Sequence, residues 1–373
     1  MQGNTKRGFD DDAQVRIASL EAIPYALPFR QPYVTATGVL TRREMVLLRL
    51  RDEEGREGLG EAVPLSLRGG ASLKQVVAEL DELAEREALD EAGLGGDAGA
   101  LSPPARCAAL TALLDLRGRR TAAERSSLVS SSETNSERAG PIRCNATLVA
   151  GEPVAVVSAA ERWAAEGFST FKLKLGAGDD VAQVHAVREA LGPRAKIRID
   201  ANAAWDLETA KDVLAAIEPC EIELAEQPVA SIEEALELTS TTSIPLAADE
   251  SVTSRADAER VASSGAFALT GIKLSKVGGP ETALGIAEVL PAYVTSALDG
   301  PVGIAVAAQV AQSLGDLGRS AGESLAHGLA TQRLFAATIA ARECELRGDM
   351  LHPPDGPGLG VEIDEAALRA HRL

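Results

Sequence analysis

From residue 141 onward, short apolar runs alternate with amphipathic stretches, and this alternation predicts strands and helices in turn. Helical periodicity is clear, for example, over 153–166, 181–191 and 207–217. A strand followed by a helix, repeated along the chain, predicts a parallel (β/α) barrel over residues 141–346. Its eight strands are expected near 143–148, 170–175, 197–201, 221–226, 245–248, 269–273, 292–297 and 324–328.

The chain before the barrel has a different pattern. Three strand-like runs are followed by two amphipathic stretches, which predicts a small α+β domain over residues 15–118. The polar segment between the second and third runs contains Gly55, a residue that tolerates positive φ, so these runs are expected to form a hairpin. The strands are expected at 15–17, 44–50 and 58–62, and the helices at 73–91 and 103–118.

Three segments lie outside the two predicted domains. Residues 1–14 are polar and are expected to be disordered, and residues 119–140 are Ser-rich and charged, which is typical of a linker or mobile loop. The Gly/Pro-rich tail, residues 347–373, is expected to fold back onto the α+β domain.

Composition excludes some classes of partner. The net charge of −18 disfavours nucleic acid and anionic membranes, because both require a basic face. No apolar run reaches the ~20 residues that cross a bilayer, and the start of the chain lacks the apolar core of a signal peptide. The four cysteines form no C-x-x-C pair. These features predict a cytoplasmic protein with reduced thiols.

Five charged residues recur near the ends of predicted barrel strands: Lys174, Asp200, Glu226, Asp249 and Lys273, at intervals of 26, 26, 23 and 24 residues. The C-terminal ends of parallel barrel strands meet at one mouth, where active sites are built. Any one acid alone could be a helix cap. Three carboxylates in register, with no His or Cys nearby, favour Mg²⁺, or Mn²⁺, over zinc.

The lysines on either side of the acids suggest acid–base chemistry. Lys172 and Lys174 share one face of a strand, and that face is expected to line the barrel interior. A lysine that acts as a base near neutral pH needs its pKa lowered to about 7–8. Lys276 lies an odd step from Lys273 and is expected to face solvent. The reaction class is therefore proton abstraction next to a carboxylate, with a metal that stabilises the resulting enediolate.

These residues sit in a set of longer motifs that runs along nearly the whole chain. The motifs are Gly60–Pro64, Lys172–Lys174, Asp200–Asn202 with Trp205, Glu226–Pro228, Ala248–Ser251, and Ile272–Leu274 with Gly278–Gly279. Together they resemble the enolase superfamily, in its muconate-lactonizing-enzyme subgroup.

The resemblance implies a (β/α) barrel with an N-terminal α+β capping domain and a mobile loop near residues 30–43 that closes over substrate. It implies a small-molecule carboxylate as substrate and allows a homo-oligomer. The implied metal ligands are Asp200, Glu226 and Asp249, with Lys174 and Lys273 as the acid–base pair. Residues expected to support the ligands or to contact substrate are Lys172, Asn202, Glu250, Ser296 and Asp299.

Two stretches discriminate within the subgroup. Residues 296–303 and 327–331 are similar to those of o-succinylbenzoate synthases of menaquinone biosynthesis. Dipeptide epimerases usually carry an Asp-x-Asp pair at the eighth strand, and muconate cycloisomerases are expected to carry an acid there; residues 327–331 contain neither. The implied reaction is syn loss of water from 2-succinyl-6-hydroxy-2,4-cyclohexadiene-1-carboxylate, giving o-succinylbenzoate.

Other interpretations remain open at the level of sequence. The same site could racemise N-succinylamino acids, or catalyse another racemisation or cycloisomerisation of the subgroup. A catalytically silent barrel that serves as a binding protein is poorly supported, because all five site residues are present.

Overall fold

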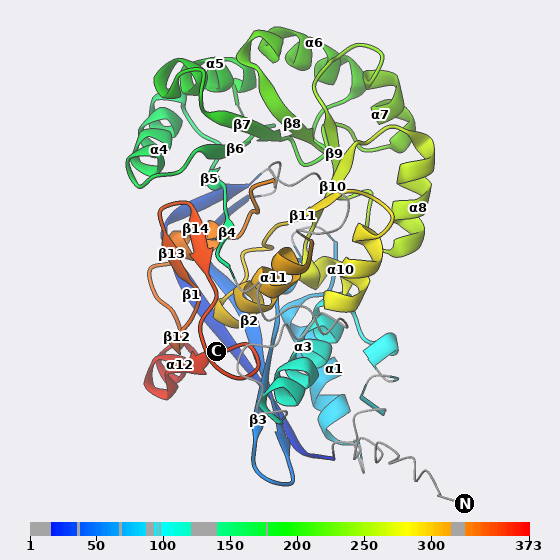
Figure 1. Ribbon diagram of the computed structural model, residues 1–373, viewed down its shortest axis with the longest axis vertical. Coiled ribbons are helices and arrows are strands. Elements are labelled where there is room, and N and C mark those ends of the chain that lie inside the picture. The colour runs from blue at the N-terminus through cyan, green and yellow to red at the C-terminus, as the bar shows by residue number, and fades with distance from the viewer. Residues whose placement is uncertain are drawn as a thin grey trace, which may run out of the picture.

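Seven parallel strands form a curved sheet in the order β11-β10-β9-β8-β7-β6-β5, so each strand lies beside the one that precedes it in sequence (Figure 1). In this computed structural model the described residues are 16–373 without 36–37, 67–68, 87–92, 95, 97, 121–139, 177 and 315–324. The predictions for residues 1–14, and nearly all of that for 119–140, fall outside them. The strands are β5 (Ala146–Leu148), β6 (Thr170–Lys174), β7 (Lys196–Asp200), β8 (Ile222–Glu226), β9 (Leu246–Ala248), β10 (Leu269–Ile272) and β11 (Ala292–Val294).

The eighth strand is much shorter than the sequence predicts. His327 and Gly328 form isolated parallel bridges to Cys144 and Thr295, and thereby join the first strand region to the end of β11. The first predicted strand is also divided. Its start, β4 (Ile142–Arg143), pairs instead with β14 (Met350–His352) in a small sheet that also contains β13 (Glu345–Arg347).

Helices lie along the outside of the curved sheet (Figure 1). Local signals set where they begin: Asp206 accepts a hydrogen bond from the Thr209 backbone at 2.8 Å, and Ser231 and Glu234 form a capping box. Their apolar faces pack on strand residues such as Phe171 and Leu173, while alternate residues of β6 point into the barrel. These helices are α4 (Pro153–Ala165), α5 (Asp180–Leu191), α6 (Leu207–Ile217), α7 (Ile232–Leu238), α8 (Arg255–Ser264), α9 (Leu274–Val277), α10 (Pro280–Ala287) and α11 (Pro301–Leu314), with short 3-10 turns at Glu218–Cys220 and Ala330–Leu334.

In the described part of the cap, helices pack on a three-stranded antiparallel sheet. Its elements are β1 (Ile17–Thr35), β2 (Gly38–Asp52), β3 (Glu57–Ala62), α1 (Leu73–Ala84) and α3 (Pro103–Arg120), with a 3-10 turn at Ala98–Ala100. The predicted hairpin is confirmed, since β2 pairs with β3. Helix α3 approaches β3 closely: a Cβ atom on Gly60 would lie 2.0 Å from the Ala108 carbonyl oxygen, so only glycine fits there.

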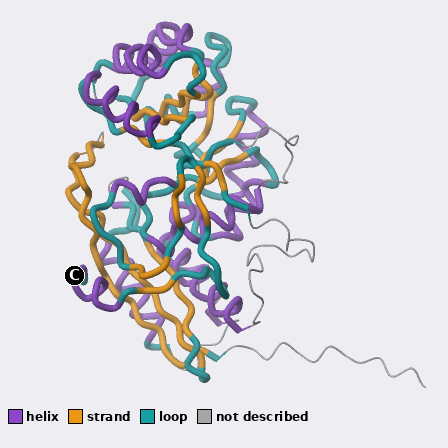
Figure 2. The backbone as a smooth tube through the Cα atoms, turned by 60° about the vertical axis from the view of Figure 1, so that its left-hand side comes forward, coloured by secondary structure: helices purple, strands orange, loops and turns teal. Residues whose placement is uncertain are grey.

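The first strand of the cap is longer than the sequence predicts. The resemblance predicts a mobile loop near residues 30–43, but the described part of that stretch belongs to the β1–β2 ladder. This long hairpin reaches the barrel, where Arg43 donates a hydrogen bond to the Ala297 carbonyl at 3.1 Å. In Figure 1 the long strands of the cap run from the end of the molecule opposite α5–α7 up towards the barrel, and the tube view of Figure 2 also shows long strands that run along the molecule.

The C-terminal tail contacts the cap. The Leu373 amide donates to the Pro24 carbonyl at 3.0 Å, and the Leu359 amide donates to the buried Asp115 side chain at 2.7 Å. The tail contains β15 (Glu362–Ile363) and α12 (Glu365–His371), and β15 pairs with β12 (Ala340–Arg342), which precedes the tail.

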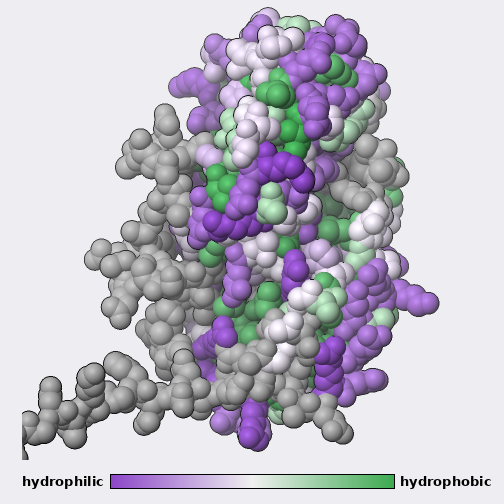
Figure 3. Space-filling model, turned by 90° about the vertical axis from the view of Figure 1, so that its right-hand side faces the viewer, coloured by the Kyte–Doolittle hydropathy of each residue, from purple (hydrophilic) through white to green (hydrophobic). Residues whose placement is uncertain are grey.

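Few large hydrophobic side chains are exposed among the described residues. Figure 3 shows mostly hydrophilic side chains on the side of α8, with hydrophobic ones in separate areas. None of the helices in the described part of the chain has both the length and the apolar character of a bilayer-spanning helix. The large hydrophobic side chains exposed in the described part of the chain are Val39 in β2, Val154 in α4, Leu236 in α7 and Leu373 after α12.

A buried glutamate joins the cap to the barrel. Glu61 of β3 accepts hydrogen bonds from the Gly300 amide at 2.6 Å and the Val302 amide at 3.3 Å, at the start of α11, and from the Tyr25 hydroxyl at 2.9 Å. Burial, and then the nearby charge of Asp299, raise the pKa of Glu61 from its usual 4.5 to about 8.

We therefore expect Glu61 to make stability depend on pH. Between 4.5 and about 8 the folded protein keeps a proton on Glu61 that the unfolded chain has released, so stability falls as pH rises through this window. Glu61→Gln cannot ionise and should remove this part of the slope. Urea unfolding of both proteins across the window measures it, with the more exposed Glu57→Gln as control. Equal slopes in wild type and Glu61→Gln would contradict the expectation.

Candidate active site

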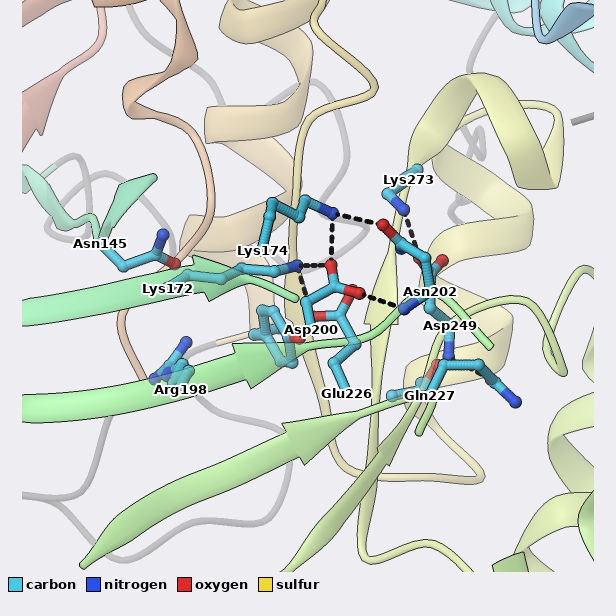
Figure 4. Close-up of polar contacts among 12 residues, drawn as sticks. Asn145, Lys172, Lys174, Arg198, Asp200, Asn202, Glu226, Gln227, Asp249 and Lys273 are labelled. Atoms are coloured by element: carbon cyan, nitrogen blue, oxygen red, sulfur yellow. Dashed lines mark hydrogen bonds and ion pairs between the residues drawn. The ribbon is translucent and has the colours of Figure 1, made fainter. Parts of the chain in front are cut away.

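The structure brings the five sequence-predicted residues together at one end of the sheet (Figure 4). Lys174, Asp200 and Glu226 are the last residues of β6, β7 and β8, and Asp249 and Lys273 directly follow β9 and β10. The Lys174 Nζ atom lies 2.5 Å from Asp200 Oδ2, and Lys273 Nζ contacts Asp249 Oδ2. The interval read from the sequence thus corresponds to consecutive strand exits.

Lys172 lies deepest and bridges two of the acids. Its Nζ atom is 2.8 Å from Asp200 Oδ2 and 2.5 Å from Glu226 Oε2. Burial alone would lower the pKa of Lys172, but the charges of Asp200 and Glu226 raise it above its usual value. Lys172 therefore stays a cation and is suited to hold carboxylates, not to accept a proton.

For Lys174, in contrast to Lys172, the effect of burial on the pKa is stronger than that of the neighbouring carboxylates. Burial lowers the pKa of Lys174 to about 8, against the effect of Asp200 and with help from the positive charges of Lys172 and Lys273. Its Nζ atom also donates to Asn202 Oδ1 at 3.1 Å. A substantial fraction of Lys174 is thus neutral near pH 8, which is the property that a general base needs.

The prediction that Lys276 faces solvent is wrong. Its Nζ atom lies 2.6 Å from Asp249 Oδ1 and also contacts the Asp249 carbonyl oxygen. The prediction assumed strand periodicity, but the strand ends at Ile272 and the single helical turn α9 brings Lys276 to the same side as Lys273. Asp249 therefore faces two ammonium groups.

The donor set of the three acids fits a hard divalent cation such as Mg²⁺. Burial would raise the pKa of Asp200 and of Asp249, yet the neighbouring lysines, led by Lys172 for Asp200 and Lys273 for Asp249, lower both, so these carboxylates are ionised. Glu226 is fully buried and its Oε1 atom has no hydrogen-bond partner. Among the described residues, no three Asp, Glu, His or Cys side chains are placed as they would be around one metal ion, and Lys172 and Lys273 contact the three carboxylates.

Known proteins share both sequence and fold with this chain. Residues 155–367 match the enolase C-terminal domain-like family. The chain belongs to the enolase superfamily. An o-succinylbenzoate synthase from Thermobifida fusca (strain YX) is 39% identical over 233 residues, which cover 60% of this chain and 68% of that protein.

Solved structures agree with this membership. The muconate lactonizing enzyme from Pseudomonas fluorescens, complexed with muconolactone, superimposes with a TM-score of 0.87 at 27% identity, covering 96% of this chain and 100% of that one. A dipeptide epimerase from Enterococcus faecalis V583, complexed with Mg and the dipeptide L-Leu-L-Tyr, shares the fold with a TM-score of 0.82 at 24% identity, covering 93% and 99%. The predicted superfamily, subgroup and fold class are confirmed.

The remaining predicted residues of this superfamily member fall into two groups. Asn202 and Glu250 border the acids, and Asn202 Nδ2 donates to Glu250 Oε1 at 3.4 Å. Ser296 and Asp299 lie at the junction with the cap, where their hydrogen bonds join them to each other at 2.7 Å and to Ser275 at 3.3 Å. The described contacts do not connect this second pair with the three acids.

Sequence reasoning assigned no role to Gln227, although it noted the motif that contains it. The Gln227 Oε1 atom accepts hydrogen bonds from the backbone amides of Asp249 at 2.9 Å and Ser251 at 3.2 Å. This side chain therefore holds the loop that carries Asp249. Its position directly after Glu226 was the available signal, since residues at strand exits face the same mouth.

Proposed function

We propose that this enolase-superfamily enzyme removes the proton next to the carboxylate of 2-succinyl-6-hydroxy-2,4-cyclohexadiene-1-carboxylate and expels water, forming o-succinylbenzoate. The observation that carries this choice is the exit of the eighth strand. Leu329, Ala330 and Thr331 are buried there, and no Asp or Glu occurs between residues 325 and 342. A dipeptide substrate presents an ammonium group that needs a carboxylate partner, whereas the proposed substrate carries only anionic and neutral groups.

Lys174 and Lys172 have different roles in the proposed reaction. Neutral Lys174 accepts the proton from the ring carbon that bears the carboxylate. In a syn elimination the hydroxyl leaves from the same face, so the Lys174 ammonium can return this proton to the departing oxygen as water forms. Lys172, which stays charged, contacts both Asp200 and Glu226 and holds these side chains in place.

Asp200, Glu226 and Asp249 would hold the divalent cation. When bound, it would stabilise the negative charge that develops on the substrate carboxylate. The partnerless Glu226 Oε1 atom is the described donor most directly available for this role.

A second candidate is racemisation of N-succinylamino acids. It is favoured by the placement of Lys174 and Lys273 on β6 and directly after β10, with the strands that carry the three acids between them. Two bases on opposite sides of a carbon can remove and return a proton on different faces. The proposed dehydration needs only one of them.

The test is an ultraviolet assay of the purified protein with Mg²⁺ and the cyclohexadiene carboxylate. We expect rapid formation of the aromatic product and its loss with EDTA. In parallel, N-succinylamino acids, a dipeptide and muconate are incubated with the enzyme in D₂O and examined for exchange or conversion. Exchange of the N-succinylamino acid without dehydration would move the assignment to the racemase, and turnover of only the dipeptide or muconate would reject both candidates.

A further inference from the structure

A tyrosine deep in the barrel contacts one of the three acids. Tyr293 of β11 is fully buried, and its hydroxyl donates a hydrogen bond to Glu226 Oε2. The same oxygen accepts from Lys172 Nζ at 2.5 Å. The two oxygens of Glu226 thus differ sharply: Oε2 has two donors, and the equally buried Oε1 has none.

The barrel is built to admit this ring. Gly271 of β10 pairs with Tyr293 in the sheet, and a Cβ atom on Gly271 would lie 3.1 Å from both the Cζ and the hydroxyl oxygen of Tyr293. Ala247 of β9 belongs to the same small buried cluster as Tyr293. Two small residues on consecutive strands therefore leave space for the ring to extend from β11 towards β8.

A buried arginine lies over the Tyr293 ring. The Arg198 guanidinium carbon lies 5.2 Å from the centre of the Tyr293 ring, within the range of a cation–π contact. Arg198 is itself fixed by Glu223 at 2.5 Å and by the Ala326 carbonyl at 2.7 Å. A carboxylate oxygen accepts hydrogen bonds, so the Tyr293 hydroxyl is the donor in its contact with Glu226 Oε2.

We propose that Tyr293 is a positioning residue for the metal ligand Glu226. By binding Oε2 together with Lys172, it fixes the carboxylate so that Oε1 is left to coordinate the divalent cation. This inference rests on the metal site of the proposed function. Loss of a group that orients a metal ligand in this way typically weakens metal binding by roughly 10- to 100-fold.

The test compares Mg²⁺ affinity of wild type, Tyr293→Phe and Tyr25→Phe by calorimetry, with competition by Mn²⁺ as a second readout. Tyr25 is an equally buried tyrosine whose hydroxyl donates to another glutamate, Glu61, at the junction with the cap. We expect Tyr293→Phe to bind Mg²⁺ about 10- to 100-fold more weakly and Tyr25→Phe to bind it as wild type does.

Every other result would overturn either the inference about Tyr293 or the proposed metal site. Tyr293→Phe with an affinity within twofold of wild type would overturn the inference, as would equal weakening in both variants, which indicates general destabilisation. Wild type without Mg²⁺ binding would overturn the metal site itself. If Tyr293→Phe does not fold, Gly271→Ala tests the inference instead, because it keeps the Tyr293 hydroxyl but displaces the ring. Unchanged Mg²⁺ affinity in Gly271→Ala would overturn the inference.

Discussion

Replacing Lys174 with alanine is expected to lower kcat/KM for the proposed dehydration by about 10²- to 10⁴-fold, the usual contribution of a positioned general base. Burial lowers the pKa of Lys174 to about 8, whereas Lys172 beside it stays charged and cannot take over the proton. The loss should appear in kcat as well as in kcat/KM, because the proton is transferred only in the transition state. Formation of the aromatic product, followed by ultraviolet absorbance, measures it.

Mg²⁺ affinity distinguishes a lost base from a damaged site. Lys174 contributes no ligand oxygen, and its ammonium group lies 2.5 Å from Asp200, so its removal should leave Mg²⁺ binding intact or tighter. Lys196→Ala is the matched control, since this exposed lysine lies at the opposite end of β7 from Asp200. If Lys174→Ala retains a tenth or more of wild-type activity, Lys174 is not the base.

Asp249→Asn is expected to abolish strong Mg²⁺ binding and to lower kcat/KM by about 10³-fold or more, which corresponds to several kcal/mol of transition-state stabilisation. The substitution removes one of three carboxylates. It also leaves the ammonium groups of Lys273 and Lys276 facing each other without the charge that both now contact. Their repulsion should oppose a cation at the remaining two acids. Calorimetry with Mg²⁺ and the absorbance assay measure the two effects.

An aspartate outside the site provides the control. Asp206 is exposed and caps α6 through the Thr209 amide, a role that asparagine fills equally well. Asp206→Asn should therefore match wild type in affinity and rate. Unchanged Mg²⁺ affinity in Asp249→Asn would show that the cation is held elsewhere.

The sequence predicted the barrel and the residues that meet at its mouth because both follow from one period. A strand, a helix and two short loops repeat at a nearly constant length, so charged residues that end successive apolar runs must lie side by side. Lys174, Asp200 and Glu226 are the last residues of their strands. This reasoning uses only local pattern and the topology of parallel sheets.

The sequence did not predict the contacts of Lys276 and Tyr293. These contacts arise where the strand periodicity ends, or between residues that are far apart in the chain. Lys276 belongs to a helical turn that starts directly after Lys273, where strand periodicity no longer applies. Tyr293 lies within a short apolar strand and its partner Glu226 is 67 residues away, so nothing next to it in the sequence marks its role. Space for its ring comes from Gly271, whose purpose is visible only when β10 and β11 are paired.

The eighth strand has a consequence for how such enzymes diverge. Its main chain bonds to both neighbours, since the His327 amide donates to the Arg143 carbonyl at 2.7 Å and the Gly328 amide to the Val294 carbonyl at 2.8 Å. The His327 side chain adds one bond, in which Nδ1 accepts from the Val294 amide at 3.0 Å. The side chains of Leu329–Thr331, which follow, take no part in these bonds. Substitutions at this exit can thus alter the charge offered to a substrate without opening the barrel. Substrate preference and the closure of the barrel therefore depend on different groups. A few substitutions at this exit can change which substrate binds while the barrel stays intact.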